Sequence, residues 1–192
     1  LDGVLDILGN PPVVGRPELP APEPYKIVWT ADVPGPRDAQ QRAWEELTKV
    51  GRGIAKLTTG LGKTLLCAML ASSYPGQVVL VTTPNLTLLH QNRDEMTAFL
   101  GEDVGILGDS EQDLQPRIVV ATIQSLVSRI ALGDQVVISW LGTVGLWLCD
   151  ECHGAAAESY QDLSRALTSC NLRMGVTATW RREDGTQRIM EA

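Results

Sequence analysis

The sequence predicts an α/β fold in which a parallel β-sheet is flanked by helices on both faces. Short runs that are apolar at almost every position, such as residues 77–82 and 144–149, alternate with longer segments whose apolar residues recur at helical spacing. Strands of this composition fit a sheet that is buried on both faces. The alternation indicates right-handed βαβ units, in which ligands bind at the carboxyl ends of the strands.

The composition is that of a globular protein with an acidic balance. The 192 residues include 16 Lys and Arg against 23 Asp and Glu, for a net charge of −7, and 44% of them are hydrophobic. A chain of this length forms one domain that buries about 70% of its unfolded surface. The net charge argues against broad electrostatic capture of nucleic acid, but it leaves room for a narrow contact strip of amides and hydroxyls.

Neither a membrane span nor an export signal is predicted. No apolar run reaches the ~18 residues of a membrane helix, and residues 1–4 lack the basic and apolar regions of a signal peptide. We therefore expect a cytoplasmic protein that is not secreted. Because the first residue is not Met, we also expect the chain to be a fragment of a longer protein.

Residues 1–36 contain eight of the eleven prolines, which disfavours helices and central strands. We predict an extended arm, or the end of a preceding domain, with a strand-like piece at residues 25–29. The main domain is predicted over residues 37–192 and begins with an amphipathic helix over residues 37–47, ending at Gly51. The apolar face of this helix consists of Ala43, Trp44, Leu47 and Val50.

A glycine loop lies between a predicted strand, residues 53–57, and a predicted helix that begins near Lys63. Gly60 and Gly62 can adopt backbone angles closed to other residues, so consecutive N–H groups can surround phosphate oxygens. Lys63 would neutralise phosphate charge, and the Thr64 hydroxyl would ligate Mg²⁺. The general pattern G-x-x-x-x-G-K-[ST] has glycine where this chain has leucine at position 57. A strand-to-helix turn that happens to carry Gly-Lys-Thr is therefore the alternative.

Further elements alternate along the rest of the chain. Strands are predicted at residues 77–82, 104–107, 118–122, 144–149 and 172–176, and helices at residues 85–100, 123–127 and 156–169. The core of the helix over residues 85–100 is expected to include Leu86, Leu89, Met96 and Phe99. Residues 108–116 are predicted as a polar loop, and residues 133–142 are ambiguous.

Asp150 and Glu151 follow the apolar strand over residues 144–149, so they are predicted at the sheet edge that carries the glycine loop. Phosphoryl transfer to water needs a metal anchor and a group that positions the water. Asp150 could reach Mg²⁺ beside Thr64, and Glu151 could orient or deprotonate water. Seen alone, the pair reads as a solvated turn, but together with the glycine loop it favours nucleotide hydrolysis.

The segment from Cys149 to His153 also matches C-x-x-C-H, which is typical of haem attachment, and C-x-x-C suggests zinc or redox chemistry. Haem attachment requires export, and zinc requires a second pair of ligands, whereas Cys67, Cys170 and His90 are scattered singly. We therefore expect neither haem nor zinc and interpret the thiols as reduced and incidental.

The motifs and their order resemble those of superfamily two helicases of the DExH type. Residues 150–153 resemble the DExH box, and residues 57–64 resemble motif I, whose first residue is often apolar in that family. Residues 37–40 resemble the upstream adenine-reading segment, with Ala39 where an aromatic residue is common.

Three further segments follow in the same order. Residues 81–85 are similar to motif Ia, residues 120–126 to motif Ib and residues 177–179 to motif III. The continuation to residue 185 looks most like the XPB-like and phage UvsW-like branch, although Trp180 stands where proline is usual. The resemblance covers about residues 37–185.

The resemblance implies a RecA-like domain that uses ATP and Mg²⁺. It implies nucleotide binding by Arg37, Gln40, Thr59, Gly60, Leu61, Gly62, Lys63 and Thr64. Gln40 would read adenine, Thr64 and Asp150 would hold Mg²⁺, and Glu151 would be the catalytic base. The implied catalytic residues are Lys63, Asp150, Glu151 and His153. His153, Thr177 and Thr179 would couple the nucleotide state to strand movement, and Thr83, Pro84, Asn85, Thr122 and Gln124 would lie near the nucleic-acid backbone.

By this resemblance the chain is expected to be the N-terminal motor domain of an ATP-dependent helicase or translocase, with DNA favoured over RNA. It would act wherever its nucleic acid is, in the cytoplasm, nucleoid or nucleus. Helicases of this family use a second RecA-like domain that supplies arginine fingers, worth roughly 10³ to 10⁵ in rate. That second domain is expected to be absent here, so the isolated fragment should bind ATP weakly and hydrolyse it slowly or not at all.

Two other classes stay open. One is a nucleotide-dependent module that grips duplex or branched nucleic acid without separating strands. The other is a phosphate-loop ATPase that is not a helicase, which would leave motifs Ia, Ib and III unexplained.

Overall fold

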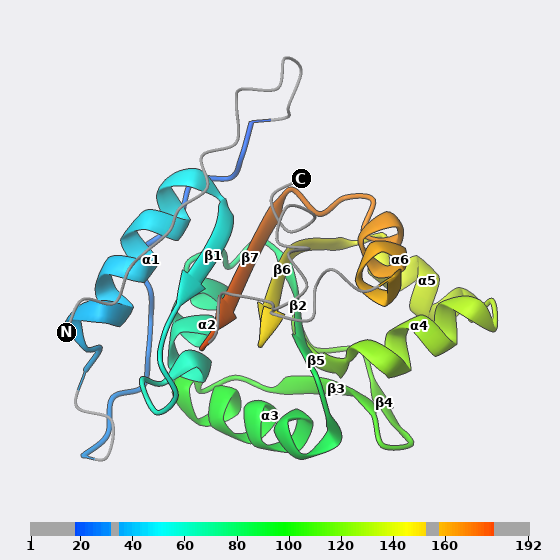
Figure 1. The fold of residues 1–192 in the computed structure, drawn as a ribbon, viewed down its shortest axis with the longest axis horizontal. Coiled ribbons are helices and arrows are strands. Elements are labelled where there is room, and N and C mark those ends of the chain that lie inside the picture. The colour runs from blue at the N-terminus through cyan, green and yellow to red at the C-terminus, as the bar shows by residue number, and fades with distance from the viewer. Residues whose placement is uncertain (1–17, 32–34, 153–157, 179–192) are drawn as a thin grey trace.

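The computed structural model describes residues 18–31, 35–152 and 158–178. Its centre is a seven-stranded sheet in the order β1-β7-β6-β2-β5-β3-β4 (Figure 1). The strands are β1 (Arg52–Lys56), β2 (Val78–Thr83), β3 (Val104–Gly108), β4 (Glu111–Asp113), β5 (Ile118–Thr122), β6 (Val144–Asp150) and β7 (Leu172–Thr177). All neighbouring strands are parallel except β3 and β4, which form an antiparallel hairpin.

Six helices cover the two faces of the sheet within the described residues. They are α1 (Asp38–Val50), α2 (Lys63–Ser72), α3 (Leu86–Leu100), α4 (Ile123–Ala131), α5 (Gln135–Leu141) and α6 (Glu158–Ala166). One cluster of buried side chains joins the sheet to α1, α2 and α3, and a second joins its other face to α4, α5 and α6 (Figure 1). The predicted α/β sandwich is therefore confirmed. None of the described helices combines the length and the apolar composition needed to span a bilayer.

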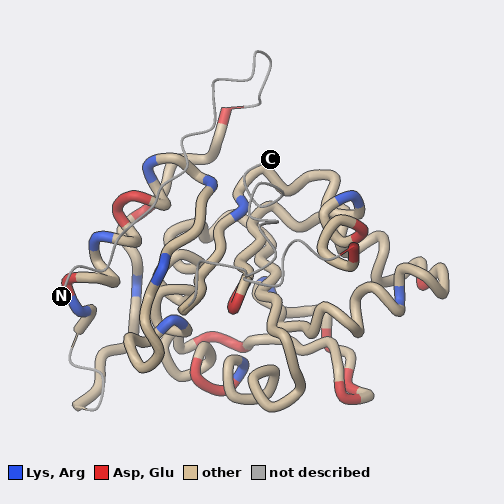
Figure 2. The backbone as a smooth tube through the Cα atoms, viewed as in Figure 1, with Lys and Arg blue, Asp and Glu red and all other residues tan. Residues whose placement is uncertain are grey.

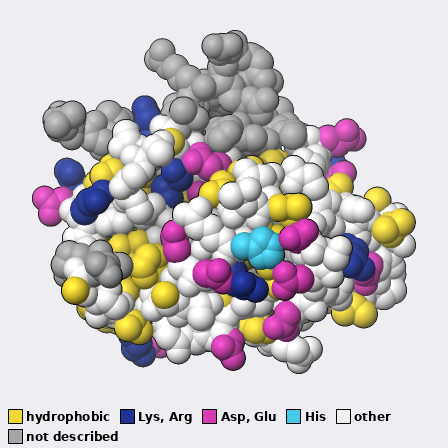
Figure 3. Space-filling view, turned by 90° about the horizontal axis from the view of Figure 1, so that it is seen from below, with side chains coloured by type: hydrophobic (Ala, Val, Ile, Leu, Met, Phe, Trp, Pro, Cys, Tyr) yellow, Lys and Arg dark blue, Asp and Glu magenta, His cyan; other side chains and the backbone are white. Residues whose placement is uncertain are grey.

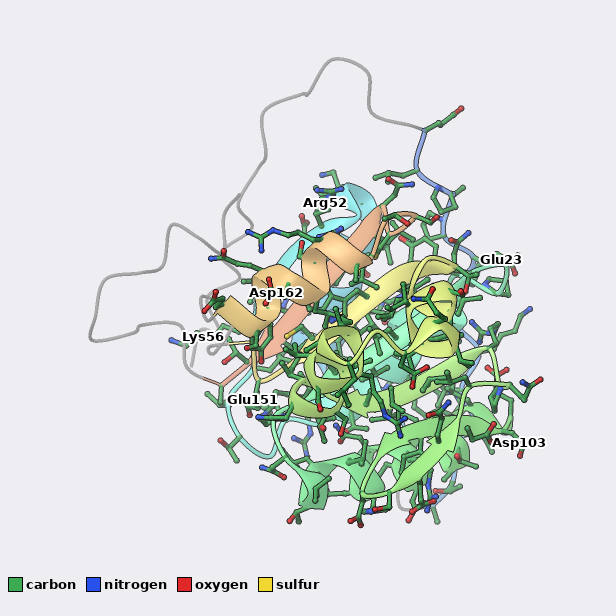
Figure 4. The ribbon with its side chains drawn as sticks, turned by 90° about the vertical axis from the view of Figure 1, so that its right-hand side faces the viewer. Glu23, Arg52, Lys56, Asp103, Glu151 and Asp162 are labelled. Atoms are coloured by element: carbon green, nitrogen blue, oxygen red, sulfur yellow. The ribbon has the colours of Figure 1, made fainter. Side chains whose placement is uncertain are left out.

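Charge is arranged as a buried sheet requires. Most Lys, Arg, Asp and Glu residues lie on the helices and loops, whereas an acidic segment marks the carboxyl end of β6 (Figure 2). Strands β5 and β6 are buried at every position, which explains their continuously apolar sequences. Lys56 ends β1 and Glu151 follows β6, and both lie on one side of the molecule, whereas Asp103, which precedes β3, lies on the opposite side (Figure 4). The carboxyl ends of β1 and β6 are therefore on the same side of the domain.

Several element predictions need correction. Residues 108–116 are not entirely loop, because Asp109 and Ser110 take φ values of 50° and 63° and turn the chain into β4. The ambiguous residues 133–142 form α5, whose first amides bond to the Asp134 side chain. Val50 and Leu86 are exposed rather than core, because each lies at the end of its helix. Helix α6 ends at Ala166 and not at the predicted residue 169.

The N-terminal segment over residues 18–31 is extended, but the predicted strand at 25–29 is wrong because these residues join no sheet. The segment bonds to helices instead: the Glu23 amide donates to the Ser73 carbonyl at 2.8 Å, and the Val28 amide donates to the Phe99 carbonyl at 2.7 Å. Tyr25 packs edge-on against Trp44, with ring centroids 5.0 Å apart. The segment therefore lies along the face formed by α1, α2 and α3.

Candidate nucleotide-binding site

The glycine loop connects β1 to α2, as predicted. Gly60 and Gly62 have φ values of 81° and 68°, in the left-handed region that favours glycine. A Cβ at Gly62 would lie 2.6 Å from the Gln40 Nε2 atom, so a larger residue there would displace the Gln40 side chain as well as strain the backbone. Leu57 is 2% exposed and belongs to the core. Its burial gives a physical reason for the apolar residue at the position where the general pattern has glycine.

Lys63 and Glu151 meet although 88 positions separate them in the sequence. The Lys63 Nζ atom lies 2.8 Å from Glu151 Oε1, and the two side chains are 14% and 20% exposed. Glu151 has a φ of 53°, which is rare for a residue with a side chain. The other carboxylate oxygen of Glu151 accepts hydrogen bonds from the Thr177 hydroxyl and the Ala178 amide, both at 3.4 Å. The sequence-predicted base thus touches both the phosphate-loop lysine and the end of β7.

Thr64 and Asp150 are joined through Asn92 of α3. The Thr64 hydroxyl donates to Asn92 Oδ1 at 3.1 Å, and the Asn92 amide nitrogen donates to Asp150 Oδ2 at 3.0 Å. Asp150 is 4% exposed, and its Oδ1 atom is buried without a hydrogen-bond partner. Sequence reasoning missed Asn92. The sequence could have indicated that this amide is buried, because Asn92 lies one helical turn from Leu89 and Met96 and so falls on the apolar, buried face of the helix.

Burial raises the pKa of the Asp150 carboxyl above its ordinary value, because a charged group loses hydration there. The hydrogen bond from Asn92 opposes this rise. A buried carboxylate with one oxygen unpaired is costly to the fold. That oxygen is of the type that Mg²⁺ selects as a ligand, so the residues present fit a magnesium ion.

The predicted adenine-reading residues contact the glycine loop. The Arg37 guanidinium donates to the Gly60 carbonyl at 2.8 Å, and the Gln40 amide donates to the Gly62 carbonyl at 2.9 Å. The Gln40 side-chain oxygen accepts from the Arg37 amide at 2.8 Å. The Gln40 nitrogen therefore holds the glycine loop, and its oxygen caps the start of α1. Thr59 and Leu61 belong to the same loop, where Thr59 is exposed and Leu61 packs partly against the core.

The candidate nucleic-acid residues follow two adjacent parallel strands. Thr83 and Thr122 are register partners at the ends of β2 and β5. Both are buried: the Thr83 hydroxyl donates to the Asn85 carbonyl at 3.2 Å, and the Thr122 hydroxyl caps α4 by accepting from the Ser125 amide at 3.1 Å. Pro84 is half-buried, whereas Asn85 and Gln124 are exposed. The two threonines shape the loops, and the accessible surface comes from their neighbours.

Asp and Glu side chains gather on the surface formed by α3 and the β3–β4 hairpin (Figure 3). Two side-chain contacts join α3 to the β3–β4 hairpin: His90 Nε2 lies 3.0 Å from Asp109 Oδ2, and the Arg93 guanidinium lies 3.8 Å from Glu111 Oε2. Acidic side chains repel phosphate. The β3–β4 hairpin is therefore an unfavourable surface for a phosphate backbone.

His153 and Thr179 lie outside the described residues. Cys149 and Cys152 are buried thiols, and burial raises the pKa of Cys149 to about 12. In the part of the chain that the structure describes, no group of three His, Cys, Asp or Glu side chains could hold a metal ion. The expected absence of haem and zinc stays a prediction.

A glycine loop between a strand and a helix, faced by an acidic pair at the end of another parallel strand, defines a phosphate-loop domain of the RecA-like class. The chain belongs to the family described as type III restriction enzyme, res subunit, whose model matches residues 34–182. The resemblance to superfamily two helicase domains, given above on motifs alone, is confirmed.

Two curated relatives show the same kinship. The chain is 31% identical over 154 residues to "DNA 3'-5' translocase XPB2" of Sulfurisphaera tokodaii, covering 80% of this chain and 33% of that protein. It is 26% identical over 152 residues to "ATP-dependent DNA helicase uvsW" of Enterobacteria phage T4, covering 73% of this chain and 28% of that protein. The chain therefore spans about a third or less of the length of these relatives.

Solved structures share the fold. The UvsW helicase from bacteriophage T4 superimposes with a TM-score of 0.74 at 21% identity, over 86% of this chain and 61% of that one. The Hef helicase domain of Pyrococcus furiosus gives a TM-score of 0.68 at 22% identity, over 85% and 37% of the two chains. The predicted RecA-like fold is confirmed.

Proposed function

We propose that the chain is the Mg-ATP-binding motor domain of an ATP-dependent DNA helicase or translocase. The observation that carries this proposal is the convergence of Lys63 and Thr64, which begin α2, with Asp150 and Glu151 at the carboxyl end of β6. The names of the two curated relatives, a DNA translocase and a DNA helicase, support the choice of DNA.

Each residue has a physical role in this proposal. Gly60 and Gly62 direct backbone amides toward phosphate, and Lys63 leaves Glu151 to pair with the phosphate oxygens. Thr64 and Asp150 would hold Mg²⁺, which when bound would supply positive charge that offsets the charge of the phosphates. Glu151, released from Lys63, orients and deprotonates water.

The end of β7 connects this chemistry to movement. Because the Thr177 hydroxyl and the Ala178 amide both reach Glu151, release of Lys63 changes the contacts at the start of the motif III segment. His153 and Thr179 are proposed to act in the same coupling. Pro84, Asn85 and Gln124 are proposed to contact the DNA backbone on loops shaped by Thr83 and Thr122.

Since the matched part of this chain covers only 33% and 28% of the two curated relatives, we propose that a second RecA-like domain completes the cleft and supplies arginine fingers. Residues 1–36 are proposed to act as an extended arm that braces the motor domain. The described part of this arm contacts α1, α2 and α3.

The proposal is tested in the full-length parent by DNA-stimulated ATP hydrolysis. Glu151→Gln is expected to lower the rate at least 100-fold, because it removes the base. Glu158→Gln makes the same change at an exposed site on α6 and is expected to leave the rate unchanged. A stimulated rate that survives Glu151→Gln contradicts the assigned base. Strand displacement with and without ATP then separates unwinding from translocation or remodelling on duplex DNA.

A further inference from the structure

Asn92 is a polar residue in an apolar row. It lies on the face of α3 that carries Leu89 and Met96, and it is 3% exposed. Burying an amide there costs free energy unless its polar atoms are paired. Both of its hydrogen bonds go to the proposed magnesium ligands, Thr64 and Asp150.

The chemistry of the two partners fixes the orientation of the amide. An ionised carboxylate only accepts hydrogen bonds, so the NH₂ group must face Asp150 and the carbonyl oxygen must face Thr64. The Thr64 hydroxyl then donates its only hydrogen to Asn92, so its lone pairs stay available for a metal ion. Asp150 likewise has Oδ2 occupied and Oδ1 without a partner. One amide thus leaves each ligand with an oxygen lone pair available.

We propose that Asn92 is a positioning residue that orients Thr64 and Asp150 for Mg²⁺, a role that rests on the proposed function. A leucine at this position has a similar shape but can neither donate to Asp150 nor accept from Thr64. An aspartate can accept from Thr64, but it places a second negative charge beside Asp150. Of these three side chains, only the amide satisfies a donor and an acceptor at once.

The test measures the affinity of the isolated chain for fluorescent ADP, once with Mg²⁺ and once with EDTA. The ratio of the two affinities reports the magnesium site, whereas affinity in EDTA reports the phosphate loop alone. Asn92→Leu is expected to lower the Mg²⁺-dependent ratio at least tenfold, as losses of groups that orient metal ligands do. Affinity in EDTA should change less than twofold, a separation that a merely structural role would not produce.

Met96→Leu is the matched control, because it alters the same buried face of α3 one turn away and conserves volume. It should leave the ratio unchanged. Asn92→Ala is measured beside Asn92→Leu, since its smaller side chain leaves room for water and protects the fold. It should lower the ratio as well.

The outcomes separate this inference from the function it rests on. If the unmodified chain binds fluorescent ADP more tightly with Mg²⁺ than with EDTA, but the ratio of the two affinities is unchanged in both Asn92 variants, only the role of Asn92 is overturned. A parent that binds fluorescent ADP equally with Mg²⁺ and EDTA overturns the magnesium site and the inference together. A parent that binds in neither condition overturns the proposed nucleotide site itself.

Discussion

The Lys63 Nζ atom lies 2.8 Å from Glu151 Oε1, so the phosphate-loop lysine and the candidate base neutralise each other in this structure. The two side chains are largely buried, which limits solvent screening of their attraction. A nucleotide must separate the pair before Lys63 can reach phosphate and before Glu151 can reach water. Under the proposed function, this ion pair would oppose nucleotide binding and would withhold the base until a nucleotide arrives.

This competition predicts the effect of Glu151→Gln on binding. We expect the affinity of the isolated chain for ADP to rise about fivefold, since ~1 kcal/mol of pairing is no longer lost when the phosphate arrives. Equilibrium titration with a fluorescent ADP analogue measures the change. The exposed Glu158→Gln variant should bind as the parent does. Weaker or equal binding by Glu151→Gln would show that the ion pair does not compete with phosphate.

The buried carboxylate of Asp150 is expected to lower the stability of the folded chain. The carboxyl has an ordinary pKa of 3.8 in the unfolded chain, and burial raises the pKa in the folded chain. Between these two values the folded state holds a proton that the unfolded state has released, so stability falls as pH rises. Above the raised pKa the cost is constant. Below 3.8 it is absent.

Asp150→Asn should therefore stabilise the magnesium-free protein at pH 7 to 8, because the amide can still accept from Asn92 and carries no charge. Each ~1 kcal/mol gained shifts the melting temperature by about 2 to 4 °C for a chain of this size. The gain should shrink as pH falls toward 4. Thermal unfolding near pH 7.5 and near pH 4 measures the gain in stability. Asp103→Asn, at an exposed position, is the control. A gain that is the same at both pH values would refute the electrostatic explanation.

Much of this site could be predicted from the sequence because its residues stand close together in short, recognisable motifs. Gly60, Gly62 and Lys63 stand in one loop, and Asp150 ends a strand whose apolar composition marks it as central. The parallel sheet then brings the two segments to one edge. Sequence alone could not predict Asn92, because its hydrogen bonds cross to two other elements and leave no spacing pattern.

The errors in the predicted elements also have physical causes. All three residues of β4 are exposed, so the strand has no apolar alternation and depends on backbone pairing with β3. Val50 and Leu86 fit the apolar spacing of their helices, but they lie at the helix ends, where no layer covers them. Spacing predicts which face of a helix is apolar and not how far the neighbouring layer extends.

The contacts of Arg117 stabilise the fold at a place distant from the candidate nucleotide site. Its guanidinium donates to the carbonyls of Ala71, Tyr74 and Gln77 at 3.2 to 3.4 Å, and it pairs with Glu102 at 2.5 Å. These carbonyls follow α2 or end it, where a helix leaves acceptors unpaired. One side chain thus joins β5 to the carboxyl end of the helix that begins at the phosphate loop.

Arg117→Leu should lower the free energy of unfolding by about 2 to 3 kcal/mol, because three partly buried carbonyls lose a charged donor and Glu102 loses its cation. Urea denaturation measures the loss. Arg165→Leu is the matched control: Arg165 pairs with Asp162 at 2.8 Å, but its side chain is 72% exposed, and such pairs contribute at most ~1 kcal/mol. Affinity for fluorescent ADP in EDTA should stay within twofold of the parent in both variants, since the α2 end that binds phosphate is untouched. Equal losses of stability in the two variants would show that Arg117 acts as an ordinary surface charge and does not brace α2.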